Sequence, residues 1–434
     1  MAGGEEFVGR RLPGGLEAWV WPRRGLQNRY AAFGVRFGAM DARFAVDGRT
    51  YEVPDGTAHF LEHMAFEAGR GGALGLFSRL GVRANAFTST SVTAYHFSGT
   101  DNFRPALERL TSLVLVSRLT PAGVAAERRV IAQEIRMTED SPEARVLENL
   151  LGGLYHRHPV RRRIAGTVES IADVTPDLLD LCHRTFYHPS NLVFVAAGEL
   201  EPERVFDTVA AALEKLGATG PAPAPRRLLP EEPPLPARPE VTDRMAVNRP
   251  TFLVGYKDPR PAGYGGSTGR DGDGLETSAR TRFRREIVLN LVVEALFGPA
   301  SDLYADLYRR GLVDESFSAR YSSDRSFGHV VVGGTTRDVD RAARELQAGI
   351  CRRRPNGITE PELRRKRRKA RGQYAGLSDS LEGLATLFLM YRLQGVDLGA
   401  YPDILDDIDP DELSRAQAEL FVPERAVVSS VRSL

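Results

Sequence analysis

An internal repeat constrains the fold of this chain more than any single segment does. Residues 76–100 predict the end of a helix, a tight turn and two strands, and residues 307–335 predict the same elements in the same order. Both segments end in Gly-Thr ahead of a predicted helix. Self-similarity over this distance indicates that one structural unit occurs twice, so we expect two homologous halves.

A second pair of segments extends the repeat. Residues 120–143 align without gaps on residues 359–382, with a shared first threonine, a basic helix face and a closing Ser-x-Glu. The alignment pairs acidic residues of the first half with other residue types in the second: Glu127 with Lys366, and Glu134 with Gln373. The two halves therefore share a fold but differ in chemistry.

A proline-rich stretch separates the halves. At 434 residues the chain exceeds the usual size of one hydrophobic core. Closely spaced prolines at 220–240 predict an extended linker, with an N-terminal half at 1–219 and a C-terminal half at 241–434. Residues 258–274 are rich in Gly and Asp and predict a flexible surface insertion without secondary structure.

The pattern of strands and helices predicts the fold class. Residues 30–38 and 94–99 have strand patterns, whereas 105–119 and 126–137 are amphipathic helices. Short turns can join neighbouring strands while helices follow strand pairs, which favours an antiparallel sheet. We expect an α+β fold of two α/β sandwich halves, each a mostly antiparallel sheet packed against helices. No glycine-rich phosphate loop follows a strand, so a nucleotide-binding fold has little support.

Overall composition indicates no charged partner and no membrane span. The formal net charge is only +1, which argues against nucleic-acid or membrane-surface binding. No window approaches the roughly 18 apolar residues of a transmembrane helix. The only cysteines, Cys182 and Cys351, suit a reducing compartment better than a disulfide framework. We expect a cytoplasmic protein.

The stretch HFLEHMAFE at 59–67 carries the main chemical signal. At 3.6 residues per turn, His59, Glu62 and His63 share one helical face, so both imidazoles can reach one metal ion. The alternative is a helix with two ordinary polar histidines, which would be favoured for either histidine alone. The pair with a glutamate between them favours a zinc site.

A catalytic zinc site needs a third protein ligand and an open position for water. Glu127 and Glu134 lie two helical turns apart in AERRVIAQEIRM and share a face. Glu134 could complete the ligand set with Glu127 behind it. The alternative is a solvated acidic face paired with the neighbouring arginines 128, 129 and 136.

These motifs resemble those of a known family. The order H-x-x-E-H, N-A-F-T-S at 85–89 and E-x6-E at 127–134 is similar to the inverzincins of the pitrilysin, insulinase and mitochondrial-processing-peptidase type, in particular a bacterial processing-peptidase-like branch. The resemblance covers the whole chain and implies a zinc metalloendopeptidase that hydrolyses peptides with a metal-activated water. It assigns one zinc ion to His59, His63 and Glu134, the general base to Glu62 and a supporting carboxylate to Glu127.

The resemblance also implies where a peptide would bind. In the family the stretch equivalent to Asn85, Ala86, Phe87 and Thr88 lies on an edge strand beside the metal, where a substrate can add as an extra strand. The alternative is an ordinary strand after a turn. The family also has an Arg and a Tyr from the second half that bind the substrate carbonyl; Arg320 and Tyr321 are the candidates, with Arg325 as a competitor for the arginine.

The second half lacks the metal motif. Its equivalent of the zinc helix, LNLVVEALFGPAS, has no histidine, and Gln373 is a poor substitute for a carboxylate. We therefore expect one zinc per chain. Family members of this size resemble subunits that form homodimers, or heterodimers with a related partner that lacks zinc. The remaining alternatives are a non-catalytic peptide-binding or assembly subunit, and a dedicated maturation protease for one peptide.

Two basic segments contain residues that could indicate further sites. His156 and His158 have no accompanying acidic or cysteine cluster, so we expect a solvated or substrate-facing basic loop at 156–166 rather than a second metal site. The run RRKRRKAR at 364–371 predicts an exposed or subunit-facing helix surface rather than a nucleic-acid site.

Overall fold

The structure is a computed structural model that describes residues 6–67, 72–261, 272–354 and 357–434. The chain forms two compact units that are not continuous in sequence. Unit 1 comprises residues 1–136, 163–229 and 375–394; unit 2 comprises residues 137–162, 230–374 and 395–434.

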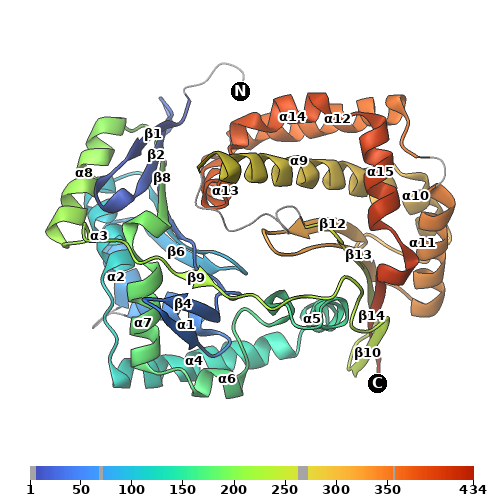
Figure 1. Cartoon of the computed structure of the whole chain (residues 1–434), viewed down its shortest axis with the longest axis horizontal. Helices are drawn as coiled ribbons and strands as arrows, with labels where there is room; N and C mark the ends of the chain where they lie inside the picture. The colour runs from blue at the N-terminus through green and yellow to red at the C-terminus, as the bar shows by residue number, and fades with distance from the viewer. Residues whose placement is uncertain (1–5, 68–71, 262–271, 355–356) are drawn as a thin grey trace. The chain divides into compact units, whose positions relative to one another are not determined.

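Unit 1 is built on a six-stranded sheet (Figure 1). The strand order is β1 (Val8–Arg11), β2 (Glu17–Pro22), β8 (Leu192–Gly198), β3 (Arg29–Val35), β7 (Thr93–Gly99) and β6 (Arg83–Thr88). Only β2 and β8 run parallel to each other; all other neighbours in this sheet are antiparallel. The prediction of a mostly antiparallel sheet is confirmed.

Helices cover one face of this sheet. They are α1 (Thr57–Glu67), α2 (Gly72–Arg79), α3 (Phe103–Leu115), α4 (Pro121–Glu139), α6 (Val168–Ala172), α7 (Pro176–Phe186) and α8 (Pro202–Lys215). Alternation along β3 sends Ala31, Phe33 and Val35 into one core with side chains of these helices. The opposite face of β3 contacts α13 (Leu381–Leu393). Gly34 permits this contact, because a Cβ there would clash with leucines of α13.

Unit 2 repeats this topology. Its sheet has the order β10 (Glu240–Met245), β14 (Ala426–Ser433), β11 (Thr251–Lys257), β13 (Gly328–Thr335) and β12 (Ser318–Ser323), which matches β2-β8-β3-β7-β6 strand for strand. Its own helices are α9 (Gly272–Phe297), α10 (Asp302–Arg309), α11 (Val339–Arg353), α12 (Glu360–Gly376), α14 (Tyr401–Asp407) and α15 (Pro410–Leu420). The expectation of two homologous halves in an α+β fold is confirmed.

One helix is exchanged between the repeats. The helix α5 (Pro142–Leu154) follows α4 in the first half but packs on β11 and β14 of unit 2. Its counterpart α13 follows α12 in the second half but packs on β3 and β8 of unit 1. Gly255 on β11 faces leucines of α5, as Gly34 on β3 faces leucines of α13. The compact units therefore differ from the sequence halves by these helices.

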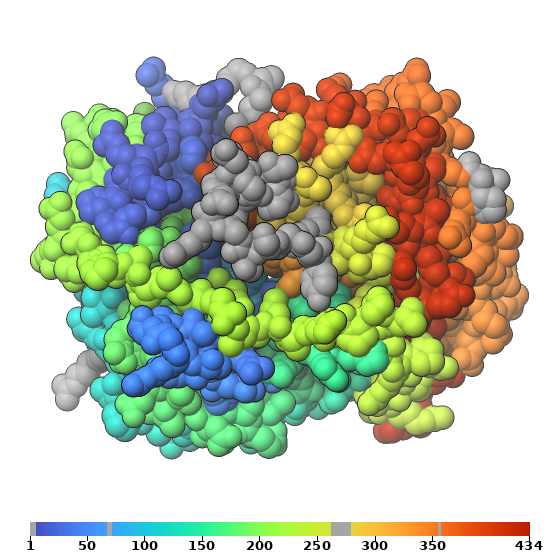
Figure 2. Space-filling model, viewed as in Figure 1, coloured from blue at the N-terminus to red at the C-terminus, as the bar shows by residue number. Residues whose placement is uncertain are grey.

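The proline-rich stretch 220–240 is extended and lies on the molecular surface (Figure 2). It contains the short strand β9 (Arg226–Arg227), which joins a three-stranded sheet with β4 (Arg43–Val46) and β5 (Arg49–Glu52). Within the same stretch, Glu232 forms an ion pair with Lys257 in unit 2. The stretch is thus anchored by specific contacts as well as extended.

The predicted insertion at 258–274 needs correction at both ends. Residues 262–271 lie outside the described part of the chain, and α9 already begins at Gly272. Asp258 is 4% exposed, and its carboxylate accepts hydrogen bonds from Arg285 and Tyr321.

Among the described residues, one stretch, Ala279–Arg309, is long and apolar enough for a membrane span by length and composition. However, 61% of its most apolar window is buried inside the structure, as in a core helix.

Candidate metal centre

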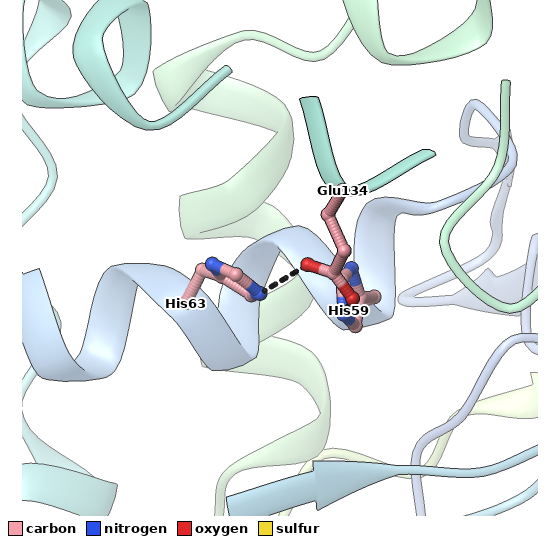
Figure 3. Close-up of side chains that lie close together, drawn as sticks. All are labelled: His59, His63 and Glu134. Carbon is pink, nitrogen blue, oxygen red and sulfur yellow. Dashed lines mark ion pairs between the residues drawn. The ribbon is translucent and has the colours of Figure 1, made fainter. Parts of the chain in front are cut away.

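Three side chains of unit 1 converge at one point (Figure 3). His59 and His63 project from α1, and Glu134 projects from α4 toward them. Their candidate ligand atoms all lie within 4.8 Å of one another. The opposite face of α1 carries Phe60, Leu61 and Met64, which are buried and fix the rotation of the helix. Core packing of α1 therefore presents both imidazoles to Glu134.

Each carboxylate oxygen of Glu134 lies at ligand spacing from one imidazole. Nε2 of His59 lies 3.5 Å from Oε1 of Glu134, and Nε2 of His63 lies 3.4 Å from Oε2. Two atoms bonded to one zinc ion at about 2.1 Å, at the tetrahedral angle, lie roughly 3.4 Å apart. Two imidazoles and one carboxylate are also a donor set that zinc prefers when a fourth position stays open. The residues present therefore fit zinc.

Glu127 fixes the ring of His63. Its Oε1 lies 2.7 Å from Nδ1 of His63, so the carboxylate accepts a hydrogen bond from the Nδ1–H group. This leaves the lone pair of Nε2 available to bind a metal ion. Burial works against the charged form of His63, but the hydrogen bond and charge of Glu127, helped by Glu134, raise its pKa above the usual value. The predicted role of Glu127 behind the ligands agrees with this geometry.

His59 has a different environment. Burial, reinforced by the neighbouring His63, lowers the pKa of His59 to about 4, so this imidazole is neutral at pH 7. Its Nδ1 is buried and has no hydrogen-bond partner among the described residues. A neutral imidazole is the form that binds a metal ion.

Glu62 is the buried carboxylate of the site. It lies on α1 between the two histidines in sequence and is 9% exposed. Burial raises the pKa of Glu62 above the usual value, against the hydrogen bond from Thr88. The Thr88 hydroxyl donates to Oε2 of Glu62 at 2.6 Å. A carboxylate that is desolvated and held by one hydrogen bond suits proton transfer.

The predicted peptide-binding stretch lies on an edge strand. Asn85, Ala86, Phe87 and Thr88 belong to β6, which pairs only with β7 in the described sheet. Asn85 is exposed, whereas the side chain of Thr88 turns toward Glu62. The position on an edge strand agrees with the prediction. The bond from Thr88 to Glu62 was not predicted, because no local pattern indicates which helix a strand residue contacts.

Arg320 and Tyr321 belong to unit 2. They lie on β12, the edge strand equivalent to β6. Arg320 is exposed, whereas Tyr321 is 7% exposed and donates its hydroxyl proton to Asp258 at 2.7 Å. The hydroxyl of Tyr321 thus already has a partner inside unit 2, and the proposed role in binding a substrate carbonyl stays a prediction.

An ion pair occupies the equivalent of the metal centre in unit 2. The repeat alignment that pairs Leu76 with Leu307 can be extended without gaps from α1 to α9. It places Glu294 at the position of His63 and Val293 at the position of Glu62. Lys366, the counterpart of Glu127, donates to the carbonyl oxygen of Glu294 at 2.9 Å, and its Nζ lies 3.4 Å from Oε1. The contact between the two helices is thus kept, but with charges that cannot bind a metal cation.

The two basic segments agree with their predictions only in part. His158 is 1% exposed rather than solvated, because its Nδ1 accepts from the Val160 amide and its Nε2 lies 3.1 Å from the Ser326 hydroxyl. The helix surface at 364–371 is exposed only in part, since Lys366 is buried against Glu294. Long-range partners account for both differences.

Comparison with known proteins identifies the family. The description "Insulinase (Peptidase family M16)" matches residues 46–168, and "Peptidase M16 inactive domain" matches residues 173–370. A Bacillus subtilis protein described as uncharacterized zinc protease YmfH is 34% identical over 98% of this chain and 96% of its own length. The chain belongs to peptidase family M16. All three candidate ligands lie in the segment that matches the insulinase description.

Two solved structures and a further sequence relative agree with the assignment. The crystal structure of an M16-like peptidase from Alicyclobacillus acidocaldarius is 34% identical, with a TM-score of 0.92 over 100% of both chains. A Helicobacter pylori protease at 19% identity and a TM-score of 0.83, covering 99% of this chain and 100% of its own, supports the fold alone. An Arabidopsis thaliana protein described as "Probable mitochondrial-processing peptidase subunit beta" is 30% identical over 48% of this chain and 38% of its own length. The resemblance inferred from the motifs is therefore confirmed at the level of the family.

Proposed function

We propose that this M16 protein is a zinc-dependent endopeptidase that hydrolyses short or unfolded peptides. The observation that carries the proposal is the convergence of His59, His63 and Glu134, with the buried carboxylate Glu62 on the same helix. A scaffold without activity would have no need for this complete set. Relatives described as zinc proteases in Bacillus subtilis and Streptomyces coelicolor support the metal and the reaction class.

In this mechanism His59, His63 and Glu134 would hold the zinc ion. When bound, zinc would polarise the substrate carbonyl and lower the pKa of a water molecule to about 7. Glu62 accepts the proton of the attacking water on Oε1, because Oε2 already accepts from Thr88. Glu62 then transfers that proton to the leaving amine. Glu127 keeps the Nδ1 proton of His63 in place throughout.

The edge strand β6 would align the substrate. An extended peptide could add alongside β6 through main-chain hydrogen bonds, which require little of its side chains. This mode favours unfolded or short peptides over folded proteins. As further parts of the proposal, the protein acts in the cytoplasm, and it works as a homodimer or as the zinc-bearing subunit of a heterodimer.

Glu62→Gln tests the reaction. The variant should bind about one zinc per chain like the wild type but lose peptide cleavage by roughly 100-fold or more, because general base catalysis is removed while the ligands remain. Zinc content is measured by metal analysis and cleavage with an internally quenched peptide. Full activity in Glu62→Gln would rule out the proposed base. A wild-type protein that binds zinc but is inactive alone would indicate a missing partner subunit.

A further inference from the structure

We infer that Thr88 is a positioning residue that holds Glu62 in the orientation needed for proton transfer. The inference rests on the proposed function and deepens it. Thr88 is the last residue of β6, and its Oγ1 lies 2.6 Å from Oε2 of Glu62. This is a short hydrogen bond to a carboxylate, of the stronger, charge-assisted kind. It leaves Oε1 without a bond to any other described residue.

A second hydroxyl fixes the direction of the bond from Thr88. Thr93 lies directly opposite Thr88 in the β6–β7 register, and their hydroxyl oxygens are 3.2 Å apart. Thr93 donates its own proton to the carbonyl oxygen of Phe37 at 2.9 Å. The Thr93 oxygen can therefore only accept, so the proton of Thr88 has two acceptors within reach and goes to the stronger one, the carboxylate of Glu62. The side chain of the base is thereby held by the hydroxyl of Thr88, whose main chain is part of β6.

The alternation of β6 separates two tasks on one strand. Thr88 and Ala86 face the core side, with Ala86 opposite the buried Tyr95, whereas Asn85 and Phe87 face the other side. The free main-chain edge of β6 is not used by the hydroxyl bond. The same strand can therefore align a peptide through its backbone and hold the base through one side chain.

Unit 2 supplies an internal comparison. The β12–β13 register places Ser323 opposite Gly328, as Thr88 is opposite Thr93, so Ser323 is the counterpart of Thr88. The counterpart of Glu62 is Val293, which has no carboxylate for a hydroxyl to hold. The hydroxyl of Ser323 instead interacts with Tyr321. The pairing of hydroxyl and carboxylate thus occurs in the unit that carries the candidate metal ligands.

The test compares three substitutions in the full-length, zinc-loaded protein. Thr88→Val is close in shape but lacks the hydroxyl, Thr88→Ser keeps the hydroxyl, and Ser323→Ala removes the equivalent hydroxyl in unit 2. We expect Thr88→Val to lower kcat by about 10- to 100-fold, because a hydrogen bond to a charged group contributes a factor of about this size. KM and zinc affinity should stay within about twofold of the wild type. Thr88→Ser should retain most of kcat, and Ser323→Ala should match the wild type.

A crystal structure of zinc-loaded Thr88→Val gives a readout that does not depend on activity. We expect the Glu62 side chain to leave its wild-type rotamer or to become disordered while His59, His63 and Glu134 keep their positions. Glu62 unmoved in Thr88→Val, or equal losses in Thr88→Ser and Thr88→Val, would overturn the inference. A misfolded Thr88→Val would leave the Ser variant and the structure of Thr88→Ala to decide in the same way. Failure of the proposed function appears separately, as a wild type that binds no zinc or as a Glu62→Gln variant that is fully active.

Discussion

The carboxylate of Glu127 lies 2.7 Å from Nδ1 of His63, so one nitrogen of this ring is committed to α4 and the other faces Glu134. Glu127→Ala should therefore weaken zinc binding by roughly 10- to 100-fold, the usual cost of losing a carboxylate that orients a metal-binding histidine. Affinity is measured by competition with a chromogenic chelator. The control is Glu108→Ala on α3, which removes a carboxylate that pairs with Arg104 at an exposed face. Equal affinities for Glu127→Ala and the wild type would contradict the assigned role.

Zinc binding should stabilise the folded protein. A ligand that binds only the folded state at a free concentration of 100 Kd adds about 2.7 kcal/mol to the free energy of unfolding. We expect zinc to raise the melting temperature of the apo protein and a chelator to reverse the shift, as followed by circular dichroism. His59→Ala should lose the shift, whereas Glu62→Gln should keep it because all three ligands remain. A zinc-dependent shift of unchanged size in His59→Ala would exclude His59 as a ligand.

Helical geometry is local, so the sequence predicted that each pair of candidate side chains shares a face, whereas the meeting of the two pairs was implied by the family resemblance. His59 and His63 are one turn apart on α1, and Glu127 and Glu134 are two turns apart on α4, so each pair shares a face whatever the rest of the chain does. The internal repeat predicted the two matching sheets for the same reason, because similar hydrophobic patterns in the two halves produce similar strands and helices.

Contacts between distant segments could not be predicted in this way. No periodicity in the sequence indicates that α5 packs on β11, that Thr88 donates a hydrogen bond to Glu62, or that Asp258 forms an ion pair with Arg285. His158 was expected in a solvated or substrate-facing loop because no acidic or cysteine cluster accompanies it, yet its partner Ser326 comes from the other half of the chain. Burial of polar groups depends on partners that only the folded structure brings together.

Unit 2 contains a buried ion pair. Lys257 and Glu232 lie 2.6 Å apart with side chains 5% and 7% exposed, and Glu232 also accepts the amides of residues 156–158. Glu232→Gln leaves the ammonium group of Lys257 buried without its counter-charge, so we expect a loss of about 3–5 kcal/mol in the free energy of unfolding. Urea denaturation measures the change. The neighbouring Glu231 is exposed, and Glu231→Gln should change stability by less than about 0.5 kcal/mol.

A double variant separates the charge from the packing of this pair. Replacing both partners, as in Glu232→Gln with Lys257→Met, removes the unpaired ammonium group and should recover part of the loss. The amides at 156–158 would still have lost a charged acceptor, so the recovery is incomplete. A double variant less stable than Glu232→Gln alone would contradict this account.

The burial of His158 should make the folded state sensitive to acid. Burial lowers the pKa of His158 to about 4 despite the nearby carboxylates of Glu232 and Asp324, whereas the pKa of an unfolded histidine is about 6.5. Between these values the unfolded chain binds a proton that the folded protein does not. The free energy of unfolding therefore falls as the pH drops from about 6.5 to about 4. Above pH 6.5 the stability that comes from the neutral imidazole is fully present. For a shift of this size the full loss is on the order of 3 kcal/mol.

His158→Asn isolates that contribution from the titration of other groups. The asparagine keeps an acceptor for the Val160 amide, which His158 binds through Nδ1 at 3.1 Å, but it does not titrate. Urea denaturation of both proteins at pH 7.5, 6.0 and 5.0 gives two stability curves. We expect the wild type to lose stability more steeply than His158→Asn over this range, because only the wild type must keep an imidazole neutral in the folded state. Parallel curves would show that His158 takes up its proton equally in the folded and unfolded states.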